Sequence, residues 1–187
     1  MPAVTWALVY ARSGRALFLT GPSGVGKTAV ALRLQEQLDD PWLFYEVDRC
    51  QPRTSPKEPP GFDIEDAERR MSRAILAAAH AYVSSGFDAI IEIDLADDYR
   101  QQCLVEIFAG TPVMRVVLTC TPHAHEQRLR ARGGPVPDKW ARMHLMSRDW
   151  RSVPADFVVV TDGQTVQETT AEVLDRLRSR SWPEHLG

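Results

Sequence analysis

The sequence predicts an α/β domain of three layers, in which a parallel sheet of five strands lies between two layers of helices. Short runs rich in β-branched and aromatic residues alternate along the chain with longer segments of helical periodicity. Such alternation implies βαβ units with right-handed crossovers, whose strands are parallel. The chain has 187 residues, of which 44% are hydrophobic, and this length suits a single core. We therefore expect residues 1–187 to form one domain.

Five apolar runs are each short enough to be a strand buried on both faces of a sheet. They span residues 16–20, 43–47, 88–93, 114–119 and 157–161. Segments with helical spacing of apolar residues lie between and after them, near residues 27–39, 65–84, 97–109, 123–132, 137–148 and 165–180. Residues 1–14 form an N-terminal extension before the first strand, to which the sequence assigns no role.

The composition excludes several classes of protein. Lys and Arg number 22 and Asp and Glu number 25, a net charge of −3, whereas a general nucleic-acid binder needs a concentrated excess of basic residues. No apolar run approaches the roughly 20 residues of a membrane span, and the first residues do not form a secretory signal. The three cysteines form no C-x-x-C pair, as is typical of reduced thiols. We expect a cytoplasmic protein without nucleic-acid or membrane partners.

The segment 21–28 reads Gly-Pro-Ser-Gly-Val-Gly-Lys-Thr and matches the phosphate-binding pattern G-x-x-x-x-G-K-[ST]. It lies between the first predicted strand and the first predicted helix, which is the context that this motif requires. Glycines let the backbone N–H groups turn inward around phosphates, and the helix N-terminus favours anions. We expect Lys27 to reach the β- and γ-phosphates and Thr28 to place its hydroxyl on Mg²⁺. The residues expected to bind the nucleotide are Gly21, Ser23, Gly24, Val25, Gly26, Lys27 and Thr28.

Among P-loop proteins, the remainder of the chain favours a small kinase. The N-K-x-D segment with which a GTPase reads guanine is absent from the sequence, and a mechanical ATPase needs a longer chain. A small kinase requires an acid that holds the metal, a group that takes or orients the proton of the acceptor hydroxyl, and a mobile cationic lid. The sequence offers a candidate for each of these parts.

The candidate acids for the metal are Glu92 and Asp94. Period-two alternation places both side chains on one face of the third strand, together with Ile90. Acidic side chains in an apolar strand are costly to bury without a cation, and Mg²⁺ is a natural partner. The alternative is that Asp94 caps the following helix. The sequence does not distinguish the two acids as metal ligands.

The candidate base is Asp48, at the end of the second strand, where it would face the phosphate loop across a cleft. A carboxylate there can take or orient the proton of an acceptor hydroxyl. The alternative is an Asx-turn before Pro52. The following residues 51–63 contain four prolines, which exclude a helix or a central strand. We expect a loop at the acceptor side of the site, although a surface linker is also possible for such a segment.

The candidate lid is the region 123–148. Arg128 and Arg132 share one face of a predicted helix, Arg130 points elsewhere, and the Gly-Gly-Pro-Val-Pro segment 133–137 would permit movement. Guanidinium groups suit phosphate oxygens and the face of adenine. The alternative is a solvated amphipathic helix. Two weaker candidates for the same role are Arg142 and Arg148.

These motifs resemble those of the chloramphenicol phosphotransferases, a family of small P-loop kinases from antibiotic-producing actinomycetes. The resemblance runs roughly from Leu17 to Leu177. It rests on segment 21–28, on Pro41-Trp-Leu-Phe-Tyr-Glu-Val-Asp48, on the strand that leads to Glu92, and on Arg128 to Gly133. Where this chain has Thr28, the family commonly has Ser, which also carries a hydroxyl.

The resemblance implies a P-loop kinase fold with an Arg-bearing lid, ATP and Mg²⁺ as cofactors, and transfer to a hydroxyl of a small molecule, such as the antibiotic chloramphenicol. The family's proposed catalytic aspartate corresponds to Asp48. The residues implied to carry the reaction are Lys27, Thr28, Asp48 and an arginine of the lid, for which Arg128 and Arg132 are the candidates.

Two other functions stay open at the level of the sequence. A nucleoside or nucleotide kinase would need basic groups or an aromatic slot at its acceptor side, and Arg49, Arg53 and Phe62 could form one. A non-catalytic nucleotide-binding protein would be expected to lack the acids, whereas Asp48, Glu92 and Asp94 are all present. The sequence does not predict an oligomeric state.

Overall fold

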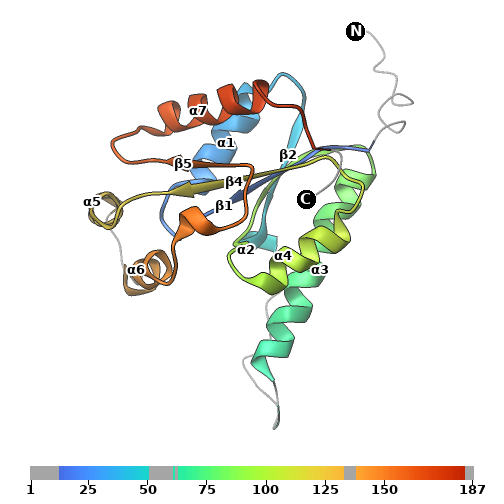
Figure 1. Ribbon diagram of the computed structural model, residues 1–187, viewed down its shortest axis with the longest axis horizontal. Coiled ribbons are helices and arrows are strands. Elements are labelled where there is room, and N and C mark those ends of the chain that lie inside the picture. The colour runs from blue at the N-terminus through green and yellow to red at the C-terminus, as the bar shows by residue number, and fades with distance from the viewer. Residues whose placement is uncertain (1–12, 51–60, 62, 133–137, 184–187) are drawn as a thin grey trace.

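A computed structural model describes residues 13–50, 61, 63–132 and 138–183, without the side chains of Asp48, Arg132 and residues 138–140. The five strands form one parallel sheet in the order β2-β3-β1-β4-β5 (Figure 1). The strands are β1 (Ala16–Thr20), β2 (Trp42–Glu46), β3 (Asp88–Glu92), β4 (Val113–Thr119) and β5 (Phe157–Val160). The prediction of five parallel strands is confirmed, and each predicted bound lies within one residue of the observed one.

The predicted helices are also confirmed. They are α1 (Lys27–Gln37), α3 (Ile64–Ser84), α4 (Asp98–Ile107), α5 (Pro122–Arg132), α6 (Asp138–Met146) and α7 (Val166–Arg178). Two short helical segments were not predicted, namely α2 (Val47–Cys50) and the 3₁₀ turn η2 (Trp150–Ser152). The pairing of β2 with β3 extends only as far as Glu46, and the chain then turns into α2. The prediction that Asp48 ends the second strand is therefore wrong, since Asp48 lies in α2.

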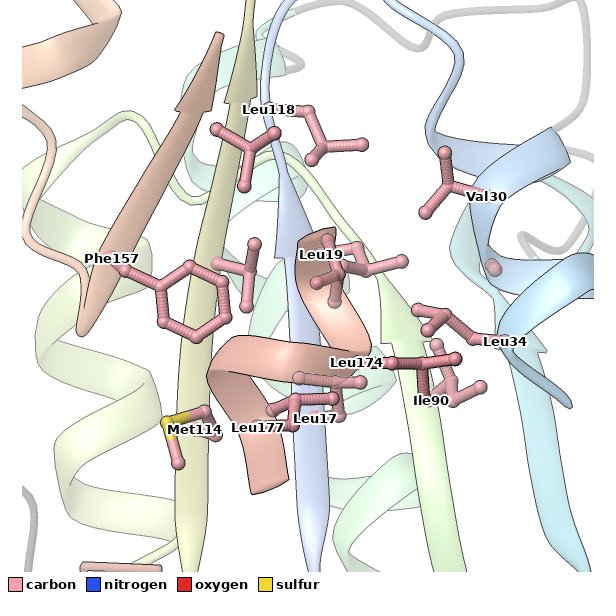
Figure 2. Packing of buried hydrophobic residues seen from close by; sticks show 14 of the residues in the cluster. Leu17, Leu19, Val30, Leu34, Ile90, Met114, Leu118, Phe157, Leu174 and Leu177 are labelled. Carbon is pink, nitrogen blue, oxygen red and sulfur yellow. The ribbon is translucent and has the colours of Figure 1, made fainter. Parts of the chain in front are cut away.

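The sheet is covered on both faces, as the three-layer prediction requires (Figure 1). On one face, Leu17 and Leu19 of β1 pack with Leu34 of α1 and with Leu174 and Leu177 of α7 (Figure 2). The alternate residues of the central strands point to the other face, where they pack against α3 and α4. This second cluster includes Phe18, Ile91, Leu76, Leu104 and Phe108. The alternation along β1 and β3 thus builds two cores from one central pair of strands.

The register of the central strands brings two sequence motifs together. In the parallel pair of β1 and β3, Leu19 lies opposite Glu92, so the phosphate loop after β1 and the acid at the end of β3 reach the same edge of the sheet. In open α/β sheets, ligands bind at this carboxyl edge.

Two features that the composition predicts can be compared with the described residues, and two predicted segments cannot. None of the described helices is long and apolar enough to span a membrane. The three cysteines are free, with Cys50 exposed and both Cys103 and Cys120 buried. Residues 1–12 of the N-terminal extension lie outside the described part of the chain, as do residues 51–60 and 62 of the proline-rich segment.

Candidate active site

The phosphate loop leads into a helix whose N-terminus has no side-chain cap. Gly26 is the N-cap of α1 and has a φ of 106°, a left-handed conformation that favours glycine. By contrast, α3, α4 and α7 are each capped by a side chain, from Asp63, Asp97 and Thr165 respectively. The first N–H groups of a helix lack intrahelical acceptors and form an anion-binding site. This arrangement fits the phosphate-binding role that the motif predicts.

Lys27 lies within the loop that it is expected to serve. Its Nζ donates hydrogen bonds to the carbonyl oxygens of Gly21, at 3.0 Å, and Pro22, at 3.1 Å. Its Nζ also lies 4.0 Å from Oε1 of Glu92, and both side chains are only 12% exposed. The ammonium group is thus held at the centre of the loop beside a carboxylate.

Thr28 and Glu92 meet directly. The Thr28 Oγ1 lies 2.8 Å from Oε2 and 3.1 Å from Oε1 of Glu92. A hydroxyl and a carboxylate are hard oxygen donors of the kind that Mg²⁺ uses. Among the described residues, no three His, Cys, Asp or Glu side chains gather into a metal-binding group. The Thr28 hydroxyl and the Glu92 carboxylate fit Mg²⁺, which binds few protein ligands and keeps several waters.

Asp94 lies beyond the end of β3 and has different partners. Its Oδ2 lies 3.0 Å from Nε2 of His144 and 3.6 Å from Nη1 of Arg100, and its Oδ1 accepts the Ala96 N–H at 2.9 Å. Burial alone would raise the pKa of Asp94, but the hydrogen bonds from His144 and Ala96 and the charge of Arg100 hold that pKa below its ordinary value. The N-cap of α4 is Asp97, so the alternative that Asp94 caps this helix is wrong.

Of the two predicted lid arginines, Arg128 can be described. Its Nη1 donates to the Val25 carbonyl at 3.2 Å and to Thr161 Oγ1 at 2.7 Å, and its Nη2 donates to the Thr161 carbonyl. Arg128 thereby connects α5 to the phosphate loop and to the end of β5. Arg132 belongs to the last turn of α5, but its side chain lies outside the description, as do residues 133–137.

The other arginines of the lid region make contacts elsewhere. Arg130 is 77% exposed and pairs with Glu126, in agreement with the expectation that it points away from Arg128. Arg142 of α6 pairs with the same Glu126, at 2.6 Å, and so joins α6 to α5. Arg148 donates to the Ala96 carbonyl and lies over the Trp150 ring. Neither Arg142 nor Arg148 is among the described residues that line the cavity of the site.

A cavity of about 780 Å³ extends from the phosphate loop to α3. On the loop side it is lined by Lys27, Thr28, Glu92 and Arg128. The opposite wall, which we call the α3 wall, consists of Glu46, Glu68, Met71, Ser72, Ile75 and Arg100. Val47, the residue before Asp48, also lines the cavity. Asp48 thus adjoins a residue that lines the cavity, and the approach of its side chain to the acceptor stays a prediction.

Sequence reasoning missed three polar residues of this region. His144 and Arg100 line the cavity, and His125 contacts the carbonyl oxygen of Ser23 in the phosphate loop. Their positions depend on tertiary packing, because α4, α5 and α6 are far from the loop in sequence. The sequence pointed to these histidines only in that they lie within the predicted Arg-rich lid. Among the described histidines of the lid, His144 lines the cavity.

Comparison with known proteins agrees with this geometry. A family model described as chloramphenicol phosphotransferase-like protein matches residues 14–178. Among curated relatives, a guanylate kinase of Synechococcus sp. (strain JA-3-3Ab) is 27% identical, with 86% of this chain and 82% of the relative covered.

Solved structures of kinases have the same fold. The APS kinase of Mycobacterium tuberculosis, in complex with AMPPNP and APS, superposes with a TM-score of 0.66 at 19% identity. The superposition covers 89% of this chain and 98% of the APS kinase chain. An unliganded sugar kinase of Janibacter sp. HTCC2649 gives a TM-score of 0.64 at 21% identity, with coverage of 88% and 95%. The chain therefore has the P-loop kinase fold.

Proposed function

This chain belongs to the chloramphenicol phosphotransferase-like family, and we propose that it transfers the γ-phosphoryl group of ATP to a hydroxyl of a small molecule. The observation that carries the proposal is the cavity in which the phosphate loop and the Thr28–Glu92 pair face the α3 wall. Nucleotide and acceptor can approach each other there from opposite sides. An antibiotic of the chloramphenicol type is the first acceptor to test, because the family is described by that name.

On the nucleotide side, Lys27 and the N–H groups of the loop bind the phosphates, and Arg128, with Arg132, is the cationic group of the lid. Thr28 and Glu92 would hold Mg²⁺, Thr28 as a direct ligand and Glu92 directly or through a bound water. Bound Mg²⁺ neutralises charge on the β- and γ-phosphates. Asp94 is the less suitable metal ligand because it bonds to His144 and Ala96 beyond the end of β3, whereas Glu92 contacts Thr28, the other expected ligand.

On the acceptor side, Asp48 takes the proton of the acceptor hydroxyl. The hydroxyl oxygen bonds to the γ-phosphorus while the bond from that phosphorus to the β–γ bridging oxygen breaks, so that the products are a phosphate ester and ADP. The carboxylate orients the hydroxyl for in-line attack and prevents a build-up of positive charge on its oxygen.

The α3 wall favours a hydroxyl acceptor over a phosphate acceptor. Among its described residues the cation is Arg100, which lies 3.2 Å from Oδ2 of Asp97 and 3.6 Å from Oδ2 of Asp94. Its Nε also donates to Ser72 Oγ at 3.2 Å. A phosphate acceptor needs cations that are not already paired with carboxylates. Glu68 on the same wall would repel an anionic acceptor, whereas Glu46 is paired with Nε of the exposed Arg49 at 2.9 Å.

A nucleoside or nucleotide kinase is the second candidate, because the curated relatives include guanylate kinases at 26–29% identity. The experiment incubates the protein with Mg-ATP and separate panels of acceptors: hydroxylated antibiotics including chloramphenicol, nucleosides, and nucleoside monophosphates including GMP. Mass spectrometry then detects the phosphorylated product. We expect a product from the first panel. Turnover of GMP alone would replace this proposal with the second candidate.

A further inference from the structure

Two histidines from neighbouring helices contact a single residue of the phosphate loop. His125 of α5 lies with its Nε2 2.7 Å from the Ser23 carbonyl oxygen, and His144 of α6 accepts the Ser23 N–H at its Nδ1, at 3.0 Å. The helices α5 and α6 pack side by side and are joined by Arg142 and Glu126 (Figure 1). The two helices of the lid region therefore hold both backbone polar groups of Ser23.

The contact of His125 is buried. His125 is only 1% exposed, and its Nε2 must carry the hydrogen, because a carbonyl oxygen can only accept. A Cβ atom added to Gly24 would lie 3.1 Å from this Nε2, so the loop and the ring are closely packed. The hydrogen bond to His125 holds the Ser23 carbonyl toward α5. A carbonyl oxygen turned toward a phosphate would repel it.

The contact of His144 faces the cavity. Its Nε2 lies 3.0 Å from Asp94 Oδ2, its ring packs edge-on against Trp150 with centroids 4.9 Å apart, and its carbonyl accepts the Trp150 Nε1–H. The ring is therefore oriented by three contacts, namely with the Ser23 N–H, with Asp94 and with the Trp150 ring. The Nδ1 carries a lone pair and occupies a backbone N–H of the kind that the loop uses for phosphate oxygens.

We propose that both histidines are positioning residues of the nucleotide site that act through Ser23 in opposite ways. His125 is a permanent anchor that keeps the loop in its phosphate-binding conformation. His144 is an exchangeable contact, which gives up the Ser23 N–H when a phosphate oxygen takes its place, and nucleotide binding thereby releases α6 from the loop. This inference rests on the proposed function only in that the loop binds a nucleotide.

The test measures the dissociation constant of Mg-AMPPNP by calorimetry for the intact protein and a set of variants. His125→Leu removes the anchor, and His125→Gln retains a donor close to the position of Nε2. His144→Gln retains a donor for Asp94 but loses the acceptor for Ser23, whereas His144→Asn retains an acceptor close to the position of Nδ1. His123→Leu is the matched control, because His123 is exposed on α5 and contacts Gln127 rather than the loop.

The expected effects have opposite signs. His125→Leu weakens nucleotide binding about tenfold, with partial recovery in His125→Gln, since an unpaired carbonyl no longer holds the loop. His144→Gln strengthens nucleotide binding about two- to tenfold, because the hydrogen bond from Ser23 to His144 no longer competes with the phosphate, and one net hydrogen bond has this magnitude. The dissociation constant of His144→Asn lies closer to that of the wild type. The His123→Leu protein binds like the wild type. A purely structural role for both histidines would weaken binding in both positions.

The inference is overturned if His144→Gln binds nucleotide as weakly as or more weakly than the wild type, or if His125→Leu binds it equally well. If His125→Leu does not fold, the pair of His144 variants decides the matter alone. Failure of the wild type itself to bind nucleotide would instead overturn the proposed function. A second readout is the ¹⁵N chemical shift of the His144 ring, which should move on nucleotide addition, whereas that of His125 should stay.

Discussion

The hydroxyl of Thr28 and the carboxylate of Glu92 lie within 2.8 Å of each other, although 64 residues separate them in the sequence. Parallel pairing of β1 with β3 brings the two together, because it aligns Leu19 with Glu92 and so fixes the height of the acid beside the start of α1. This contact distinguishes Glu92 from Asp94, which bonds instead to His144 and Ala96.

The first prediction concerns the metal. Glu92→Gln should raise the Mg²⁺ concentration for half-maximal activity about 10- to 100-fold, the range seen when a group that orients a metal ligand is removed. Asp94→Asn should change it less than about threefold. Activity measured against Mg²⁺ concentration, at saturating nucleotide, checks both variants. The opposite ranking of the two variants would assign the metal to Asp94.

The second prediction concerns Lys27. Nucleotide at a hundred times its dissociation constant should stabilise the wild type against unfolding by about 2.7 kcal/mol, and Lys27→Ala should lose nearly all of this gain. The thermal unfolding of both proteins, with and without Mg-AMPPNP, measures the difference. Arg178→Ala is the matched control, because this cation is exposed near the end of α7. Retained stabilisation in Lys27→Ala would mean that the nucleotide binds elsewhere.

The third prediction concerns Asp48. Asp48→Asn should lower kcat at least about a hundredfold, the usual contribution of a positioned acid or base, while the dissociation constant for nucleotide stays within about twofold. Asp39→Asn serves as the control, because the Asp39 side chain is 94% exposed. Steady-state kinetics and calorimetry separate the two effects. If Asp48→Asn transfers phosphate at the wild-type rate, Asp48 is not the base.

The fourth prediction concerns the junction of α5 and α6. The hydrogen bond from Arg142 lowers the pKa of Glu126 from its ordinary value of 4.5. A carboxylate whose pKa is lower in the folded state stabilises the fold when the pH is above its unfolded-state pKa. This contribution is lost as the pH falls through its folded-state pKa. Glu126→Gln should thus be less stable than the wild type at neutral pH, and the difference should shrink below about pH 4.5. Denaturant midpoints measured from pH 3 to pH 7 check this, and a constant difference would contradict it.

The layers of the fold could be predicted because β-branched runs and helical periodicity recur regularly along the chain. The four residues of α2 are too few for any periodic signal, so the second strand was extended one residue too far. The phosphate loop could be predicted because its function depends on a local sequence pattern and on its flanking elements.

The finer parts of the site depend on contacts between distant segments. Period-two alternation predicts that Glu92 and Asp94 lie on one face of the third strand. In the structure β3 ends at Glu92, and Thr28 contacts Glu92. The sequence pattern alone does not contain this difference between the two acids. His144 follows Ser23 by 121 residues and lies between Met143 and Leu145, where periodicity indicates only an amphipathic helix. Its contact with the loop arises from the packing of α6, where Leu145 joins Trp150 and Val117 of β4 in a small separate cluster.

We propose above that the protein couples cleavage of ATP to esterification of a small-molecule hydroxyl. The most direct measurement quantifies ADP and phosphorylated acceptor together, with chloramphenicol first and the remaining hydroxylated panel after it. We predict equal amounts of the two products, formed only when an acceptor is present and abolished in Lys27→Ala. The proposal would be contradicted if ADP formed at the same rate whether or not an acceptor was present and no acceptor was phosphorylated.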